Sequence, residues 1–335
     1  MKLYFQKGVW ISKRGKAAAE AIDPAEINNI AVIRHAALGD MILTRNFLIE
    51  LRKAFPKALI TFSVVSNYTS GIPGDLVDRV HILNVSSKGM DYLRNLKELQ
   101  FHDIIFDLAA TARSMWLCKM NDAKLKVGFP YHTAQRFFYD IVVPRSDMHF
   151  EVDNMLDQLK IFGFVPQIPH VYNLPGPALK RDTPYVLYFT TASTIKKCWP
   201  IERFMNLIAK MSSALPRLDH LVLEGKQAWE SVAGTAESFA GRSNVSIVEA
   251  GTVEEVVRIV KGATIVISND TSVRNIAIAA GIPSVGIFFS PAIFRYFPMP
   301  GSHAIVFNRD GSLPEVDKVF ESSLALIRKS SPAAL

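Results

Sequence analysis

The sequence predicts an α/β protein made of two Rossmann-like halves, and two observations carry this prediction. Short β-rich runs alternate with longer helical patterns, first over residues 29–165 and again over residues 185–313. Such alternation favours parallel sheets covered by helices on both faces. Between the halves, residues 166–184 hold five prolines and no periodic apolar pattern, which is typical of a linker. A chain of 335 residues can readily hold two such domains.

The first half begins with a β-rich run and an amphipathic helix. NIAVIR (29–34) is the first expected strand, and Pro56 ends the helix that follows. The apolar face of that helix is formed by Ile42, Phe47, Leu48, Leu51 and Phe55. Further strands are expected at 58–65, 80–85, 103–109 and 126–129.

The second half repeats the pattern. Strands are expected at 185–190, 219–225, 245–251, 264–270 and 284–289, and helices at 201–213, 253–261 and 272–280. A helix over about 314–329 closes the chain within a tail of residues 314–335. Residues 1–28 form an N-terminal extension, which we expect to pack its aromatic side chains on the first domain in preference to lying on a membrane surface.

The composition narrows the classes of protein. Hydrophobic residues make up 49% and charged residues 21%, which argues against disorder. No run of about 18 apolar residues is present, and the N-terminus lacks the apolar core of a signal peptide. Two cysteines, Cys118 and Cys198, form neither a disulfide framework nor a zinc site, so a cytoplasmic location is expected.

The net charge of +7 fits nucleic acid, an anionic membrane surface or phosphorylated small molecules as partners. No dense basic cluster favours nucleic acid. The eight histidines show no paired metal-ligand spacing, and no P-loop or G-x-S-x-G elbow is present. In open α/β sheets, ligands lie beyond the carboxyl ends of the strands, so with two such domains the natural site is the cleft between them.

The first strand leads into RHAALGD (34–40), which delivers Asp40 to the first turn of a helix. A dinucleotide-binding turn would need G-x-G-x-x-G here, and only Gly39 is present. Two interpretations of Asp40 are open on the residues alone. It is an N-cap, which stabilises a helix by about 1 kcal/mol, or it is a carboxylate that accepts a proton from a substrate hydroxyl.

The first strand of the second half leads into TTASTIKKCWP (190–200), in which Pro200 suits the first helical position. Its hydroxyl and ammonium groups, with free helix N–H groups, can cradle a phosphate. A solvated polar loop is the alternative. The side chains concerned are Thr190, Thr191, Ser193, Thr194, Lys196 and Lys197.

A third loop lies in SNDTSVRNIAIAAGIP (268–283), where Asp270, Thr271 and Ser272 precede a helix of small residues. The helix dipole attracts an anion to this end by roughly 0.3–1 kcal/mol. Because the charge of Asp270 would repel a phosphate, we expect Asp270 to cap the helix while main-chain N–H groups face the ligand.

Five segments, in order from about residue 29 to 310, resemble the heptosyltransferase-type glycosyltransferases (glycosyltransferase family 9). The segments are IAVIRHAALGDMILTRNFLIELRKAFPKALITF, FHDIIFDLAATARSMWLCKMNDAKLKVGF, HFEVDNMLDQLKIFGF, KKCWPIERF and ISNDTSVRNIAIAAGIPSVGIFFSP. The resemblance implies the GT-B fold, with two parallel sheets facing across a cleft. It also implies inverting, metal-independent transfer of a sugar, typically heptose from ADP-heptose, to the lipopolysaccharide core, and no cofactor beyond the nucleotide-sugar co-substrate.

Carried over by motif, the resemblance makes Asp40 the general base and Lys197 a contact of the donor phosphates. It places Ser193 and Thr194 in the diphosphate-binding stretch, and Asp270, Thr271 and Ser272 on the nucleotide side. The acceptor of this family is anionic and lipid-linked, which implies contact with the cytoplasmic face of the inner membrane. Arg113 is our first candidate for binding it, followed by Arg136, Lys119 and His132.

The chain also departs from the family pattern. Ser272 and Asn275 stand where Gly and His are expected, Phe289-Ser290-Pro291 replaces F-G-P, and Gln227 lies where a donor-site glutamate is often found. These departures bear on the identity of the donor more than on the fold. They also motivate an alternative, a catalytically degenerate member that binds a nucleotide sugar or glycan as an interaction module.

Overall fold

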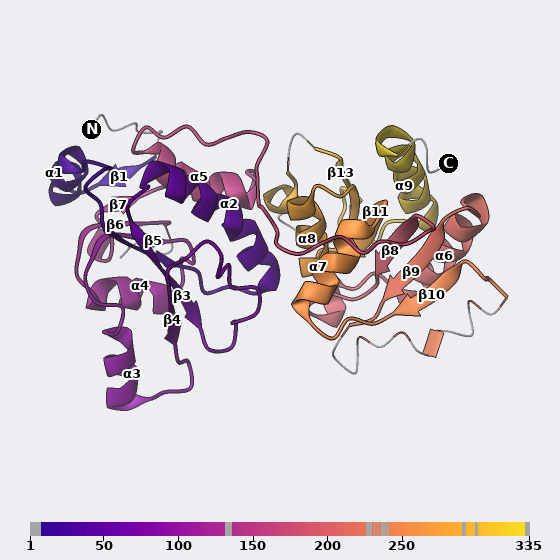
Figure 1. Cartoon of the computed structure of the whole chain (residues 1–335), viewed down its shortest axis with the longest axis horizontal. Coiled ribbons are helices and arrows are strands. Elements are labelled where there is room, and N and C mark those ends of the chain that lie inside the picture. Colours follow the sequence, from indigo (N-terminus) through magenta and orange to yellow (C-terminus); the bar gives the residue numbers. More distant parts are fainter. Residues whose placement is uncertain are drawn as a thin grey trace. The chain divides into compact units, whose positions relative to one another are not determined.

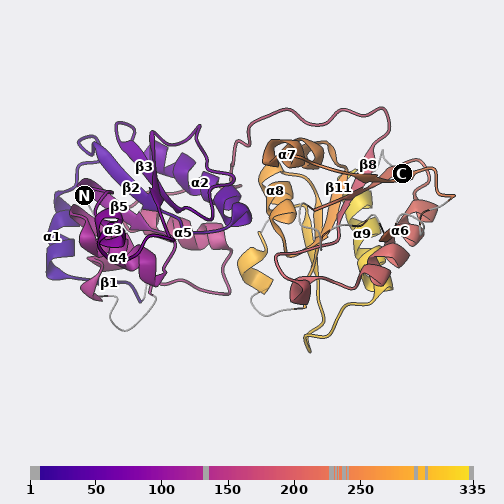
Figure 2. The same cartoon turned by 90° about the horizontal axis from the view of Figure 1, so that it is seen from below.

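The structure is a computed structural model that describes residues 8–130, 136–225, 230, 232, 234–235, 239, 241–289, 293–298 and 301–331. The chain divides into two compact units, Met1–Tyr172 and Asn173–Leu335. The division falls within the proline-rich segment 166–184. Figures 1 and 2 show that each unit is a twisted sheet flanked by helices, as expected for two Rossmann-like halves.

The first unit holds a seven-stranded sheet in the order β1-β7-β6-β5-β2-β3-β4. All neighbours are parallel except β1, which is antiparallel to β7. The strands are β1 (Trp10–Ile11), β2 (Asn29–Ile33), β3 (Leu59–Val65), β4 (Arg79–Leu83), β5 (His102–Asp107), β6 (Ala123–Gly128) and β7 (Ile141–Val142). The helices are α1 (Lys13–Ala21), α2 (Leu38–Ala54), α3 (Gly89–Leu96), α4 (Ala112–Met120) and α5 (Glu151–Lys160).

Helices cover both faces of this sheet. Phe47 of α2 packs edge-on against Phe106 of β5, with ring centroids 5.6 Å apart. The preceding residue of β5, Ile105, points to the other face and packs with Met115 of α4. Helices α2 and α5 lie side by side (Figure 1). Helix α2 is therefore buried on most sides, and not only on the one apolar face that the sequence predicts.

The second unit holds a six-stranded, fully parallel sheet in the order β10-β9-β8-β11-β12-β13. The strands are β8 (Tyr185–Phe189), β9 (Asp219–Leu223), β10 (Val245–Val248), β11 (Ile265–Asn269), β12 (Ser284–Ile287) and β13 (His303–Val306). The helices are α6 (Ile201–Ala214), α7 (Val253–Gly262), α8 (Ser272–Ala280) and α9 (Val316–Ser330), with short 3-10 turns η2 (Ile195–Lys197) and η5 (Ile293–Tyr296). Helices α6 and α9 cover one face of the sheet, while α7 and α8 lie together on the other (Figure 2).

One strand is longer than the sequence pattern predicts, and the N-terminal extension packs on the first unit. The strand expected at 126–129 is longer and runs from Ala123 to Gly128, because Ala123, Leu125 and Val127 point inward while Lys124 points to solvent. In the N-terminal extension, Trp10 packs against the core of the first unit as expected. Tyr4 and Phe5 lie outside the described residues.

Candidate functional site

Asp40 is the third residue of α2, not its N-cap. The N-cap position is held by Ala37, whose backbone is extended and whose side chain cannot bond to the helix. The N-cap interpretation of Asp40 is therefore wrong. The carboxylate instead turns toward the end of β2, where Oδ1 lies 3.1 Å from Nη2 of Arg34.

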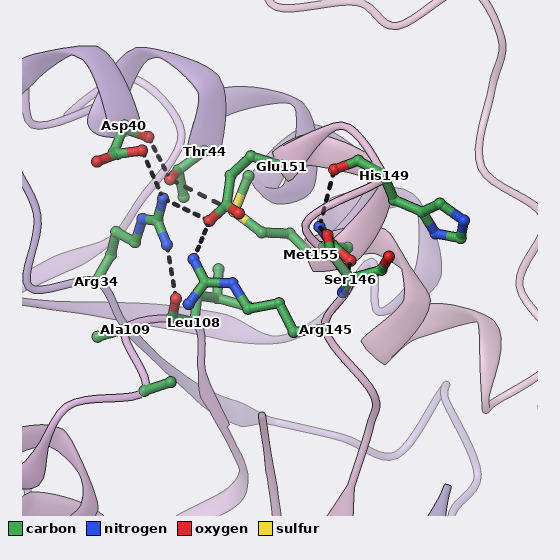
Figure 3. A network of polar contacts seen from close by, with 12 residues as sticks. Arg34, Asp40, Thr44, Leu108, Ala109, Arg145, Ser146, His149, Glu151 and Met155 are labelled. Atoms are coloured by element: carbon green, nitrogen blue, oxygen red, sulfur yellow. Dashed lines mark hydrogen bonds and ion pairs between the residues drawn. The ribbon is translucent and has the colours of Figure 1, made fainter. Parts of the chain in front are cut away.

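Arg34 is the centre of a buried polar network (Figure 3). Its Nη2 also lies 3.1 Å from Oε1 of Glu151, the first residue of α5, and its Nη1 donates to the carbonyl of Leu108 at 2.6 Å. Arg145 donates to the same Oε1 of Glu151 and stands over the ring of Phe129. The sequence motifs gave no role to Arg34, Glu151 or Arg145, because the charges that pair come from separate segments of the chain.

The four charged groups of this network sum to zero. Arg34 and Glu151 are 2% and 0% exposed, so their buried charges need partners, which they find in each other and in Asp40 and Arg145. Asp40 is 29% exposed and is the most accessible of the four, since Arg145 is 17% exposed. Asp40 is thus the charge of this network that is open to solvent, and it is held by Arg34.

The loop after β5 is held by Asp107. Its Oδ1 accepts hydrogen bonds from the N–H groups of Ala109 and Ala110, and its Oδ2 accepts from the hydroxyl of Tyr139 at 2.6 Å. Burial raises the pKa of Asp107. These bonds fix the chain around Leu108, whose carbonyl receives Arg34.

The basic residues expected to bind an acceptor fall into two places. Arg113 is exposed in the first turn of α4, and its charge, after burial and His81, helps to lower the pKa of His35 in the loop before α2. The pKa of His35 falls to about 3, mainly through burial, so this imidazole is neutral at pH 7. Arg136 instead stands over the ring of Trp10 in β1, four strands from β2 and therefore about 19 Å away across the sheet. His132 lies outside the described residues.

In the second unit, Asn269 at the end of β11 ties two loops together. Its Oδ1 accepts from the N–H of Trp199 at 2.9 Å, and its Nδ2 donates to the carbonyl of Thr190 at 2.7 Å. The start of the TTASTIKKCWP loop is thereby fixed beside the start of α8. Pro200 takes the N-cap position of α6 rather than the first helical position, and Trp199 is buried with its indole N–H bonded to the carbonyl of Pro314.

Three hydroxyl groups lie buried at the ends of the neighbouring strands β8 and β11. The Oγ1 atoms of Thr190, Thr191 and Thr271 have no hydrogen-bond partner among the described residues. An unsatisfied buried hydroxyl costs roughly 1–3 kcal/mol, so the three together fit a site completed by a polar ligand. Ser193, Thr194 and Lys197 are exposed in the same loop, and Ser272 is the first residue of α8.

Thr271, not Asp270, occupies the N-cap position of α8, and its side chain makes no capping bond. The expectation that Asp270 caps this helix is therefore wrong. The charge of Asp270 acts instead on Arg274, a buried arginine of the first turn of α8, and raises its pKa against the effect of burial, which lowers it to about 10.

Arg274 needs the glycine that the sequence places in β12. A Cβ at residue 286 would come within 2.5 Å of Nε of Arg274, so Gly286 leaves the room this guanidinium occupies. Nη1 donates to the carbonyl of Tyr296 at 2.6 Å, and the guanidinium stands over the ring of Phe288. The sequence holds one indication of this arrangement. An arginine, Arg274, stands in the first turn of a helix of small residues, and the strand that follows contains a glycine, Gly286.

A sequence model of glycosyltransferase family 9 (heptosyltransferase) matches residues 91–323, which is more than two thirds of the chain. The chain belongs to glycosyltransferase family 9. It is a glycosyltransferase, and its two parallel-sheet units are those of the GT-B fold. No curated protein matches the sequence.

Solved structures of the family share the fold of this family 9 glycosyltransferase. E. coli heptosyltransferase WaaC, with ADP-2-deoxy-2-fluoro heptose, superposes with a TM-score of 0.70 at 17% identity over 90% of this chain and 100% of WaaC. A family 9 glycosyltransferase of Veillonella parvula gives a TM-score of 0.69 at 18% identity, over 92% of this chain and 99% of the Veillonella chain. Dodecameric, iron-containing TibC of E. coli, in complex with ADP-D-β-D-heptose, gives a TM-score of 0.54 at 11% identity. The match covers 94% of this chain and 78% of TibC.

Within the described part of this glycosyltransferase, no three His, Cys, Asp or Glu side chains cluster in a way that could hold a metal ion. No helix of the same residues has the length and apolar character needed to cross a bilayer.

The departures from the family motif fall partly in the described structure. Asn275, where the family has His, is buried, and its Oδ1 has no hydrogen-bond partner among the described residues. Ser290, Pro291 and Gln227 lie outside the described residues.

Proposed function

We propose that this glycosyltransferase moves a sugar, heptose in the first instance, from a nucleotide-diphosphate sugar such as ADP-heptose to a lipopolysaccharide-core or related glycan. The transfer inverts the anomeric configuration, needs no metal and takes place at the cytoplasmic face of the inner membrane. The observation that carries the proposal is the position of Asp40, the partly exposed carboxylate and the most accessible charge of a neutral network.

Asp40 is the general base of the proposed reaction. It accepts the proton of the acceptor hydroxyl as the hydroxyl oxygen attacks the anomeric carbon from the face opposite the nucleotide. The bond between that carbon and the diphosphate oxygen breaks, and the diphosphate leaves with the electron pair. Arg34 is a positioning residue, since it holds the carboxylate at 3.1 Å without being exposed itself.

The second unit supplies the site for the diphosphate. The main-chain N–H groups at the start of α8 and the hydroxyls of Thr190, Thr191 and Thr271 provide donors to the phosphate oxygens. Lys197 adds a full positive charge, and Ser193, Thr194, Asp270 and Ser272 complete the loops around it. Stabilisation of the charge that develops on the leaving group is the main catalytic contribution expected of such donors.

The acceptor is anionic in this proposal, and Arg113 is the cation best placed to bind it. Arg113 is exposed in the first turn of α4, and its charge helps to lower the pKa of His35, which lies in the loop between β2 and α2. Arg136, at the edge of the sheet, would contact a part of the acceptor further from the reacting hydroxyl.

The test replaces Asp40 by Asn, which keeps size and hydrogen bonding but removes the base. We expect release of ADP from ADP-heptose in the presence of deacylated lipopolysaccharide core to fall at least about 100-fold, while ADP still binds. Asp91→Asn is the matched control, because Asp91 pairs with Arg94 at the same 3.1 Å but is exposed on α3. Near-normal transfer by Asp40→Asn would remove Asp40 from the mechanism. ADP binding without any transfer by the wild type would favour the degenerate, interaction-module alternative.

A further inference from the structure

One side of the first unit combines exposed aromatic rings with basic groups. In α4, Arg113, Trp116 and Lys119 repeat every three residues along the exposed face, and the indole of Trp116 is 48% exposed. The opposite face of α4 carries Met115 and Leu117, which are buried in the core. A solvent-facing tryptophan between two cations is not required by the packing of this helix.

Residues 136–138 extend the same surface. Phe137 is 61% exposed, and Nζ of Lys119 lies 3.8 Å from the centroid of its ring. Phe138 bridges Phe137 and Trp116, with ring centroids 5.4 Å from each. Next along the chain, Arg136 stands over Trp10 of β1, so aromatic and basic groups continue to the edge of the sheet. We call these six residues the aromatic–basic surface: Trp10, Trp116, Lys119, Arg136, Phe137 and Phe138.

The charge of this surface has one sign. The segments that form it, Trp10–Ile11, Ala112–Met120 and residues 136–138, contain no Asp or Glu. Helix α1 follows β1 directly and presents three exposed cations, Lys13, Arg14 and Lys16, with one exposed acid, Glu20. The adjoining carboxylate of Asp140 is 9% exposed and is engaged by Arg14 and by the N–H of Lys126.

We propose that the aromatic–basic surface docks this glycosyltransferase on an anionic lipid bilayer. Indole and phenyl rings are favoured at the depth of the lipid headgroups, and neighbouring lysine and arginine attract anionic lipids. The choice of a bilayer as partner rests on the proposed function, in which the acceptor is lipid-linked. Arg113, our first candidate for binding the acceptor, lies on the same exposed face of α4 as Trp116 and Lys119.

Binding to vesicles tests this proposal without any sugar transfer. The full chain is sedimented with vesicles of equal parts phosphatidylcholine and phosphatidylglycerol, and with vesicles of phosphatidylcholine alone. We expect the wild type to prefer the anionic vesicles by at least about tenfold, and more at low salt. Trp116→Ala with Phe137→Ala should weaken this binding about tenfold, and Lys119→Glu should do so chiefly at low salt.

Matched controls are available in the same unit. Tyr68 is 45% exposed, and Lys57 is exposed on the loop before β3, so Tyr68→Ala and Lys57→Glu should bind vesicles as the wild type does. Thermal unfolding of each variant checks that it is folded, and Lys119→Glu keeps the test valid if the double variant does not fold. Asp40→Asn should bind vesicles normally, which separates docking from catalysis.

Two results would overturn the proposal. One is equal binding of the wild type to anionic and neutral vesicles. The other is vesicle binding by the folded surface variants that matches the controls. Binding to acidic polypeptides in place of vesicles would point to a protein partner and would likewise overturn it.

Discussion

The guanidinium of Arg34 lies 3.1 Å from the carboxylate of Asp40 and, through the same nitrogen, 3.1 Å from Glu151. One buried arginine therefore joins the partly exposed carboxylate of α2 to a fully buried carboxylate of α5. Removal of Arg34 would leave Glu151 with Arg145 as its remaining ionic partner in this network and would leave Asp40 unrestrained.

We predict that Arg34→Gln lowers both stability and turnover. Breaking a buried ion pair from one side costs about 3–5 kcal/mol, which should appear as a lower free energy of unfolding in denaturant titrations. Arg34→Lys keeps the charge and should recover part of the kcat, with little change in the KM for the donor. Arg94→Gln is the control, since its exposed pair with Asp91 contributes at most about 1 kcal/mol. Equal stability of Arg34→Gln and Arg94→Gln would contradict this prediction.

We predict that Lys197→Ala weakens the binding of ADP by about 10- to 100-fold, because hydrogen bonds to charged phosphate contribute about 1.5–3 kcal/mol. Lys196 precedes it in η2 and is also exposed, so Lys196→Ala is a control for the loss of one positive charge. Titration calorimetry measures both affinities. If the two variants lose affinity equally, the effect is one of general charge and Lys197 has no specific contact.

We predict that Asn269→Leu disorders the donor site more than it destabilises the sheet. The substitution removes the bonds to Trp199 and Thr190 that hold two loops together, at a cost of about 1–3 kcal/mol. The affinity for ADP should fall with the thermal midpoint. Asn206→Leu on the exposed face of α6 should change neither. Unchanged ADP affinity in a destabilised Asn269→Leu would show that Asn269 serves the fold alone.

We predict a loss of stability as the pH falls from about 6.5 toward 5, to which His220 contributes. Burial lowers the pKa of His220 to about 4, with its Nδ1 facing the hydroxyl of Tyr188 at 2.8 Å. Because the unfolded chain takes up this proton near pH 6.5 and the folded chain does not, unfolding gains at most about 1.4 kcal/mol per pH unit from this one group. His35 and His303, with pKa values lowered to about 3 and about 4, add to the effect.

The measurement is the thermal midpoint of unfolding between pH 7 and pH 5, above the range in which most carboxylates titrate. His220→Gln should have a shallower pH dependence than the wild type, even if its midpoint at pH 7 is lower. His149→Gln serves as the control, because His149 is exposed. Identical slopes in all three proteins would exclude His220 as a contributor.

Much of the fold was predictable because its signals are local. Strands buried on both faces appear as apolar runs such as Ile265–Ile267, and helices appear as periodic patterns that end at Pro56 or Gly281. The short strands β1 and β7 carry no such signal, since two residues each cannot show a period. These two strands pair with each other only because the rest of the sheet provides an edge to which β7 can add.

The sequence by itself determined the two parallel sheets, the three polar loops at the ends of their strands and the place of Asp40 in the first turn of a helix. The tertiary structure decided which groups act on those loops. Glu151 reaches Arg34 across 117 residues, and Asn269 reaches Thr190 across 79. Local periodicity cannot report such pairs, because they form only when burial excludes water and each charge or amide must find its partner elsewhere in the chain.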